Sequence, residues 1–182
     1  MCSRPFGNIE EHDECIIAAW NDTVAPGDTI YHLGDFAYRT HSKRIRQIFD
    51  RLHGEKHLIL GNHDHKYGAT PHPTQALPWA SQSQLTEVVV DGQTLVLCHY
   101  ALRSWRNMRR GAIQLFGHSH GRMPGTRQST DVGVDVMGYV PVTLPEIKSR
   151  LAMLPALDFR EGTDAVDQLE KNDPTQDTGY GR

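Results

Sequence analysis

Residues 56–66, KHLILGNHDHK, pass from an apolar run directly into a dense group of polar side chains. The first five residues have the composition of a short buried strand, and Gly61 ends it. Asn62, His63 and Asp64 follow at once and offer an amide, an imidazole and a carboxylate, all of which can coordinate divalent metal ions. This stretch therefore predicts a strand that ends at a metal or catalytic site.

Three further apolar runs end in the same kind of residue. The run YHLG leads into Asp35, LVLC leads into His99, and QLFG leads into His118, with His120 two positions later. In open α/β sheets, ligands lie beyond the carboxyl ends of the strands, so side chains at four such ends converge on one place. The spacing predicts an α/β fold with one polar site at the edge of its sheets.

Cap residues and periodicity predict three helices. Asn8, with Glu11 three positions on, has the arrangement of a helix N-terminus. Apolar residues recur at helical spacing over 41–53, with basic residues between them. Pro145 suits the first helical position of the segment PEIKSRLAML.

Several strands are expected besides those that end at the site. Asp91-Gly92 joins the apolar runs QLTEVVV and QTLVLCH and predicts a hairpin with a two-residue turn. The later runs DVGVDV and YVPVTL, residues 131–136 and 139–144, are also expected to be strands.

The charge of the chain is unevenly distributed. The net charge is −3, but Asp158 to Arg182 carry seven acidic and three basic residues, which gives −4 for that segment and +1 for residues 1–157. Because the segment is also poor in apolar residues, we expect a folded domain over 1–156 and an acidic, disordered tail over 157–182. A nearly neutral domain excludes a nucleic-acid binder that relies on an extensive basic face.

The sequence predicts neither a membrane span nor an export signal. No apolar run reaches the ~18 residues that a membrane span needs, and MCSRPFGNIEEHDE lacks the apolar stretch of a secretory signal. Cys2, Cys15 and Cys98 show no C-x-x-C spacing, which fits a reducing compartment. We expect a cytoplasmic protein with no membrane partner; the sequence does not indicate its oligomeric state.

The predicted ligands favour a particular chemistry. Carboxylate, amide and imidazole groups suit a divalent first-row metal, whereas a structural zinc site usually needs thiolates. Two ions about 3.5–4 Å apart, bridged by a carboxylate, can hold both the attacking and the leaving oxygen of a phosphoryl group. A nearby imidazole can protonate the leaving oxygen. His63 offers such an imidazole, and Asp64 a carboxylate to orient it.

Four blocks of the sequence resemble the signature of the calcineurin-like metallophosphoesterases. They are GD at 34–35, GNHD at 61–64, CH at 98–99 and GHSHG at 117–121, in the family's order. The resemblance covers residue 3 to about residue 154, and RPFGNIEEHDE is similar to a small bacterial and phage-type subgroup. It implies a four-layer α/β/β/α sandwich of two mixed β-sheets flanked by helices.

The resemblance also implies how the metal ligands are shared. Asp35 would bridge two divalent ions, and His120 would bind the first ion. The second ion would be bound by Asn62, His99 and His118. Mn²⁺ is the expected metal, with Fe, Ni or Zn as alternatives.

The same resemblance implies the catalytic pair and the partner. His63 would contact the phosphoryl oxygens or protonate the leaving group, and Asp64 would orient His63. The partner would be a small phosphorylated substrate, whose binding residues the sequence leaves unknown.

One block of the family is absent from this sequence. The family's first strand ends in a D-x-H that gives the first ion two more ligands, and no apolar run of this chain ends in that way. The resemblance therefore implies a domain without its first strand, in which the first ion keeps only Asp35 and His120. His12 and Asp13 are the first candidates to replace the pair, although acidic residues are also expected in a first helical turn.

Two functions remain open from the sequence. The first is hydrolysis of a phosphate mono- or diester by a metal-activated water. The alternative is a catalytically impaired one-metal homologue that binds a phosphorylated ligand. Other polar side chains are expected to serve packing or solvation, with substrate steering as the alternative for the arginines: His32, His57, Cys98, Arg103, Arg106, Arg109 and Arg110.

Overall fold

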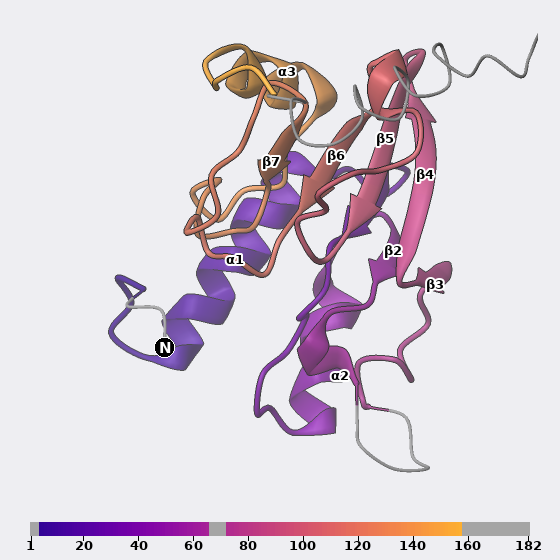
Figure 1. The fold of residues 1–182 in the computed structure, drawn as a ribbon. Helices are drawn as coiled ribbons and strands as arrows, with labels where there is room; N and C mark the ends of the chain where they lie inside the picture. The colour runs from indigo at the N-terminus through magenta and orange to yellow at the C-terminus, as the bar shows by residue number, and fades with distance from the viewer. Residues whose placement is uncertain (1–3, 66–71, 158–182) are drawn as a thin grey trace, which may run out of the picture.

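The computed structural model describes residues 4–65 and 72–157, which form two β-sheets with helices around them (Figure 1). This arrangement confirms the α/β sandwich of two sheets flanked by helices. The predicted tail over 157–182 lies, apart from Leu157, outside the described residues. No helix of the described segments is long and apolar enough to cross a membrane.

The first sheet has the order β1-β2-β3 and is parallel between its described strands. It consists of β1 (Thr29–His32), β2 (Glu55–Ile59) and β3 (Ser81–Ser83). Because β1 and β2 run in the same direction, the loops that follow them leave from the same edge of the sheet. Among the described strands, none pairs with the outer edge of β1.

The second sheet is mixed and has the order β4-β5-β6-β7. Its strands are β4 (Leu85–Val90), β5 (Gln93–Cys98), β6 (Ile113–Phe116) and β7 (Ser129–Asp131). The predicted hairpin joins β4 to β5, with Val90 paired to Gln93 across the turn. Asp91 and Gly92 both have positive φ, +46° and +75°, as a type I′ turn requires. The parallel strands β5 and β6 carry His99 and His118 just beyond their carboxyl ends.

The three predicted helices are present as α1 (Ile9–Thr23), α2 (Ser42–Arg51) and α3 (Leu144–Ala152). The side chain of Asn8 caps α1 by accepting the backbone N–H of Glu11 at 2.7 Å. Short 3₁₀ turns at Asn62–Asp64 and Met108–Arg110 complete the helical elements among the described residues.

Alternating residues of β2 connect the layers. Leu58 packs with Ile45 and Phe49 of α2, whereas Ile59 packs on the opposite side with Leu95 and other residues of the second sheet. The helix α2, beside α1, therefore covers one face of the first sheet, and the second sheet lies against the other. The apolar face of α3 joins the same inter-sheet core, at the end of the second sheet near β7 (Figure 1).

Two strand predictions are wrong. Residues 132 and 133 are irregular and 134–136 belong to a turn, because β7 ends at Asp131, whose side chain accepts the backbone N–H of Gly133 at 2.7 Å and turns the chain out of the sheet. Residues 139–144 are irregular up to the start of α3. Tyr139 has a φ of +68°, which no strand allows, and Pro141 lacks the N–H that a sheet ladder needs.

Candidate metal centre

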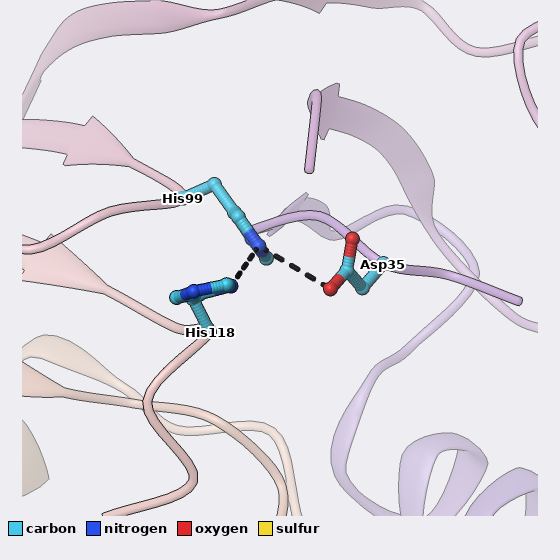
Figure 2. A group of neighbouring side chains, drawn as sticks. All are labelled: Asp35, His99 and His118. Atoms are coloured by element: carbon cyan, nitrogen blue, oxygen red, sulfur yellow. Dashed lines mark hydrogen bonds and ion pairs between the residues drawn. The ribbon is translucent and has the colours of Figure 1, made fainter. Parts of the chain in front are cut away.

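The Nε2 atom of His99 lies within a group of potential metal ligands. Three side-chain atoms surround it: Asn62 Oδ1 at 3.1 Å, His118 Nδ1 at 3.2 Å and Asp35 Oδ2 at 3.3 Å. Figure 2 shows Asp35, His99 and His118 pointing toward one another from separate loops. The structure thus brings together four of the five residues predicted as metal ligands, and His120 lies outside this group.

The spacing of this group fits a coordination shell. Metal bonds of about 2.1 Å place neighbouring ligand atoms about 3.0 Å apart in an octahedral shell and about 3.4 Å apart in a tetrahedral one. The three separations from His99 Nε2, which span 3.1–3.3 Å, fall within this range. Because the donors are oxygen and nitrogen without a thiolate, the group suits a divalent first-row metal.

Two glycines, Gly34 and Gly61, allow the loops after β1 and β2 to approach each other beside the His99 ring. A side chain on Gly34 would begin 2.5 Å from His99 Nδ1 and 2.6 Å from the nitrogen of Gly61, and Gly34 also has a φ of +94°. A side chain on Gly61 would collide with the carboxylate of Asp35. Only glycine lets the GD and GNHD backbones approach closely enough to share one set of ligands.

His99 is fixed in one tautomer. It is 1% exposed, and its Nδ1 donates to the carbonyl oxygen of Leu33 at 2.6 Å. A proton held on Nδ1 leaves Nε2 as the nitrogen that can bind a metal. The backbone at the end of β1 thus orients a ligand that follows β5.

Electrostatics couple Asp35 to His99. Burial by itself raises the pKa of Asp35, but the hydrogen bond from His99 and the backbone N–H of His63 outweigh it and hold the pKa below its ordinary value. Burial by itself lowers the pKa of His99, but Asp35 and the Leu33 carbonyl raise it above its ordinary value. In the metal-free protein, a proton on His99 therefore pairs with the Asp35 carboxylate.

The pKa of His118 moves in the opposite direction. Burial lowers it, and the neighbouring charge of His99 lowers it further. His118 is consequently neutral at neutral pH, which is the form of imidazole that coordinates a metal ion.

A buried carboxylate holds the first two loops together. Asp64 is 0% exposed, and its oxygens accept the backbone N–H groups of Asp35 at 2.7 Å, Gly61 at 2.9 Å and Phe36 at 3.2 Å. These bonds link the loop after β1 to the loop after β2. Asp64 thereby sets the position of the Asp35 backbone relative to Asn62.

A second buried carboxylate, that of Asp131, holds the backbone of the GHSHG loop, residues 117–121, in place. Asp131 accepts the hydroxyl of Ser119 at 2.5 Å and the backbone N–H of Gly121 at 2.9 Å. Ser119 lies between His118 and His120, so the last residue of β7 fixes the loop that carries both histidines.

Three of the predicted ligands have left-handed backbone conformations. The φ angles are +57° for Asp35, +61° for His118 and +50° for His120. Non-glycine residues in this region cost free energy and persist where the surroundings impose them, which occurs often at functional sites. The conformation turns each side chain sharply away from the strand before it.

The family model described as calcineurin-like phosphoesterase matches residues 10–160 of this chain. The chain belongs to the calcineurin-like phosphoesterase family. The resemblance seen in the four sequence blocks is therefore confirmed, and the loops described above bring those blocks together in this chain.

Named relatives of this phosphoesterase chain are themselves without a stated activity. It is 30% identical over 151 residues to the uncharacterized protein MJ1445 of Methanocaldococcus jannaschii, covering 79% of this chain and 77% of that protein. It is 29% identical over 160 residues to the Gene 66 protein of Mycobacterium phage L5, covering 72% and 77%. A crystal structure of the protein of unknown function AQ665 from Aquifex aeolicus shares the fold, with a TM-score of 0.58, 19% identity and coverage of 80% and 88%.

The predicted catalytic residues of this family member lie on the 3₁₀ turn Asn62–Asp64. His63 is exposed, its backbone N–H donates to Asp35 Oδ1 at 2.8 Å, and its ring packs edge-on against Tyr38 with centroids 4.6 Å apart. Within the described residues, the carboxylate of Asp64 bonds to backbone N–H groups and not to the ring of His63. Tyr38, and not Asp64, is therefore the side chain that contacts the His63 ring.

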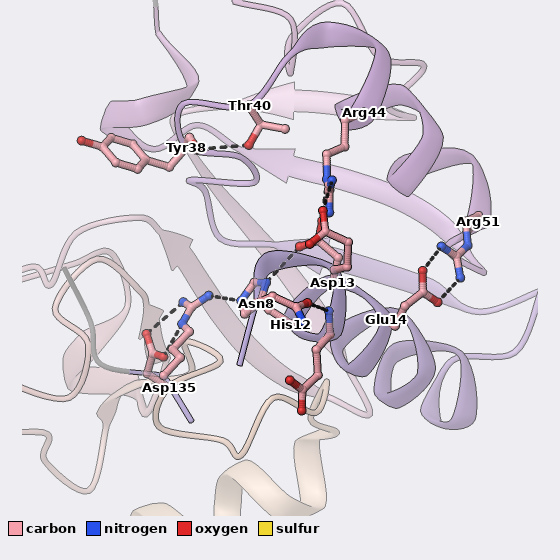
Figure 3. Close-up of polar contacts among 12 residues, drawn as sticks. Asn8, His12, Asp13, Glu14, Tyr38, Thr40, Arg44, Arg51 and Asp135 are labelled. Atoms are coloured by element: carbon pink, nitrogen blue, oxygen red, sulfur yellow. Dashed lines mark hydrogen bonds and ion pairs between the residues drawn. The ribbon is translucent and has the colours of Figure 1, made fainter. Parts of the chain in front are cut away.

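His12 and Asp13, the candidates to replace the D-x-H pair, lie in α1 and are bonded elsewhere. His12 Nδ1 contacts Asp13 at 2.9 Å, and its Nε2 lies 2.6 Å from Arg4. The other oxygen of Asp13 accepts Arg44 at 2.7 Å (Figure 3). In this arrangement neither residue offers an unoccupied ligand atom to the His99 group.

Four residues near the site were not singled out from the sequence. The sequence predicts Asp131 and Asp135 as parts of one strand and indicates no role for Tyr38 or Tyr100. Tyr100 packs edge-on against His99 at 5.0 Å and against His118 at 4.9 Å. An aromatic residue directly after a predicted ligand was the available signal for Tyr100; no comparable local signal marks the other three.

Proposed function

We propose that this chain hydrolyses a phosphate mono- or diester in a metal-dependent reaction. The observation that carries the proposal is the convergence of Asp35, Asn62 and His118 on His99 Nε2 at the spacing of a coordination shell. Membership of the calcineurin-like phosphoesterases supports the reaction class. The substrate would be a small phosphorylated molecule.

Asp35, Asn62, His99 and His118 would hold the divalent ion, for which Mn²⁺ is the first expectation and Fe, Ni or Zn the alternatives. Such an ion, when bound, lowers the pKa of a bound water and polarises a phosphoryl oxygen. The lowered pKa of His118 favours the neutral form that coordination needs, and the bond from His99 Nδ1 to Leu33 directs His99 Nε2 toward the ion. Binding of the ion would displace the proton that His99 Nε2 shares with Asp35.

His63 is the residue proposed to handle the proton of the leaving group. His63 is exposed and directly follows the proposed ligand Asn62 in the chain, and its backbone N–H donates to the proposed ligand Asp35 at 2.8 Å. The ring packs against Tyr38, which limits its rotation about the side-chain bonds. An imidazole on the same turn as a metal ligand can donate a proton to an ester oxygen as the bond to phosphorus breaks.

The second candidate function is a one-metal protein that binds a phosphorylated ligand without turning it over. One observation favours it: among the described residues, Asp35, His99 and His118 form the only group of three or more His, Cys, Asp or Glu side chains close enough to hold an ion. Chemistry that clamps a phosphoryl group between two ions needs a second set of ligands.

The decisive experiment compares two substitutions at left-handed backbone positions. His118→Gly removes a ligand at φ +61°, and Asn107→Gly makes the same backbone change at φ +58° away from the site. Since glycine accepts both conformations, both variants should fold. Hydrolysis of bis(p-nitrophenyl) phosphate and p-nitrophenyl phosphate would be followed with saturating Mn²⁺, together with metal content by elemental analysis.

We expect His118→Gly to lose bound metal and activity together, and Asn107→Gly to keep both. Metal and inorganic phosphate binding without hydrolysis of either substrate would favour the one-metal binder. Equal metal content in both variants would overturn the proposed site.

A cytoplasmic location remains part of this proposal and is supported by three cysteines without disulfide spacing.

A further inference from the structure

His120 is held by a carboxylate that the sequence patterns did not point to. Its Nδ1 lies 2.6 Å from Oδ2 of Asp135, which belongs to the turn after β7. The Asp135 side chain is only 15% exposed, so the contact is largely protected from water. A short bond between an imidazole and a carboxylate fixes both the orientation of the ring and the position of its proton.

Asp135 is itself fixed by Arg4. The guanidinium donates to both carboxylate oxygens, with Nε 2.8 Å from Oδ1 and Nη2 3.1 Å from Oδ2. Such a two-point contact prevents the carboxylate from rotating. The Arg4 guanidinium also lies 5.9 Å from the ring centroid of Tyr139, so the N-terminal segment packs on the turn that carries Asp135.

The backbone of the GHSHG loop is independently constrained. Asp131 holds Ser119 and Gly121 on either side of His120, which itself has a φ of +50°. The backbone of His120 is thus fixed from β7, and its ring is fixed from the following turn. This degree of constraint on an exposed side chain exceeds what solvation of a surface histidine requires.

We propose that Asp135 is the positioning residue of His120, keeping the proton on Nδ1 and presenting Nε2 as a protein ligand for a divalent ion distinct from the one at the His99 group. This ion is the one that the family resemblance assigns to His120 and Asp35; it is called the second ion below, and the ion at the His99 group is called the first. The inference rests on the proposed metal-dependent function. It assigns Asp135 and Arg4 to the support of the weaker of two metal positions, because His120 stands apart from the four residues gathered around His99 Nε2. Supports of this kind typically change metal affinity by about 10- to 100-fold.

The test measures metal binding rather than turnover. Calorimetric titration of the full chain with Mn²⁺ should resolve a tight first ion and a weaker second ion. Asp135→Ala should weaken the second ion by about 10- to 100-fold and leave the first unchanged, and Asp135→Asn should weaken it less because the amide oxygen can still accept from Nδ1. His120→Ala should remove the second ion.

Two further measurements separate positioning from a merely structural role. Arg4→Met removes the guanidinium but leaves the His120–Asp135 bond, so it should affect the second ion less than Asp135→Ala does. Nitrogen NMR of the metal-free chain should show His120 protonated on Nδ1 in the unsubstituted protein and in Arg4→Met, and a mixture of tautomers in Asp135→Ala.

A second ion bound equally well by Asp135→Ala, or an unchanged His120 tautomer, would overturn the inference. The inference would also be overturned if the unsubstituted chain binds one ion and no second ion at millimolar Mn²⁺. That result leaves the proposed function standing, whereas failure to bind even the first ion would overturn the proposed function itself.

Discussion

Buried carboxylates at single positions hold the candidate site together. Asp64 joins the loops after β1 and β2, and Asp131 holds the loop after β6. Each accepts N–H or O–H groups that would otherwise be left without a partner in a region largely closed to water. Their contribution is to place the ligands, and it should be visible in the stability of the metal-free protein.

Asp64→Ala should destabilise the metal-free chain by roughly 3 kcal/mol or more. The substitution removes the acceptor of three backbone N–H groups, and each unsatisfied buried donor costs about 1–3 kcal/mol. Urea unfolding followed by circular dichroism measures the difference. Asp22→Ala, on the exposed side of α1, is the matched control and should change the free energy of unfolding by about 0.5 kcal/mol or less.

His63→Ala should separate chemistry from metal binding. The ring lies beside the ligands without belonging to the group around His99 Nε2, so metal content should be nearly unchanged. Turnover of a chromogenic phosphodiester should fall by about 10²–10⁴, which is the usual contribution of a general acid. The neighbouring exposed His65 supplies the control, His65→Ala. An unchanged rate in His63→Ala at saturating metal would remove His63 from the mechanism.

At the scale of elements, patterns within a short window predicted most of the fold. The hairpin around Asp91-Gly92, the cap at Asn8 and the strands that end at the site are all encoded by neighbouring residues. The segment 131–136 has equally strong strand composition, but its fate depends on a bond between the Asp131 side chain and the backbone of Gly133. Side-chain bonds of this kind leave no periodic signal.

The same limit explains what was missed at the site. The candidate ligands Asp35, Asn62, His99 and His118 lie just after strands, so their meeting could be expected from the sheet topology alone. Asp135 approaches His120 from 15 residues further along, and Arg4 approaches Asp135 from 131 residues away. Such pairs arise only from the packing of whole elements, so one sequence alone does not reveal them.

The start of α3 provides a prediction about pH. Glu146 accepts the backbone N–H and the hydroxyl of Thr143, each at 2.7 Å, and these bonds lower the pKa of Glu146 below its ordinary value of 4.5. A lowered pKa in the folded state means that the stabilisation is present above pH 4.5 and is lost as the pH falls through the folded value.

Glu146→Gln should therefore melt at a lower temperature than the unsubstituted chain at pH 7, and the gap should close as the pH falls below about 4.5. Thermal melts across this range measure the gap. For the control Asp22→Asn, at an exposed position, the difference in melting temperature from the unsubstituted chain should not shrink in this way as the pH falls. A gap that persists in acid would mean that the Glu146 carboxylate is not the source of the difference.

Across the whole molecule, two sheets and the N-terminal segment meet at one site. Asp35 and Asn62 come from the first sheet, and His99 and His118 come from the second. The N-terminal segment adds Arg4, which bonds to Asp135, the carboxylate that contacts His120. Metal binding should consequently link the two sheets, and the two proposed metal positions should differ in affinity because they would differ in the number of protein ligands around them.

The chain should retain about one divalent ion after extensive dialysis, and its hydrolysis should rise with added Mn²⁺ toward millimolar concentrations. Four protein atoms are gathered at the first position, whereas the proposed second position would have the ring of His120 and a share of Asp35, and affinity grows with the number and preorganisation of ligands. Elemental analysis of the dialysed protein and a phosphodiesterase assay over a Mn²⁺ series measure both quantities. His118→Gly, with Asn107→Gly as its control, should bring the retained ion well below one per chain. Two tightly held ions with full activity in the absence of added metal would contradict the prediction, and would mean that His12 and Asp13 exchange their bonds to Arg4 and Arg44 for bonds to the metal.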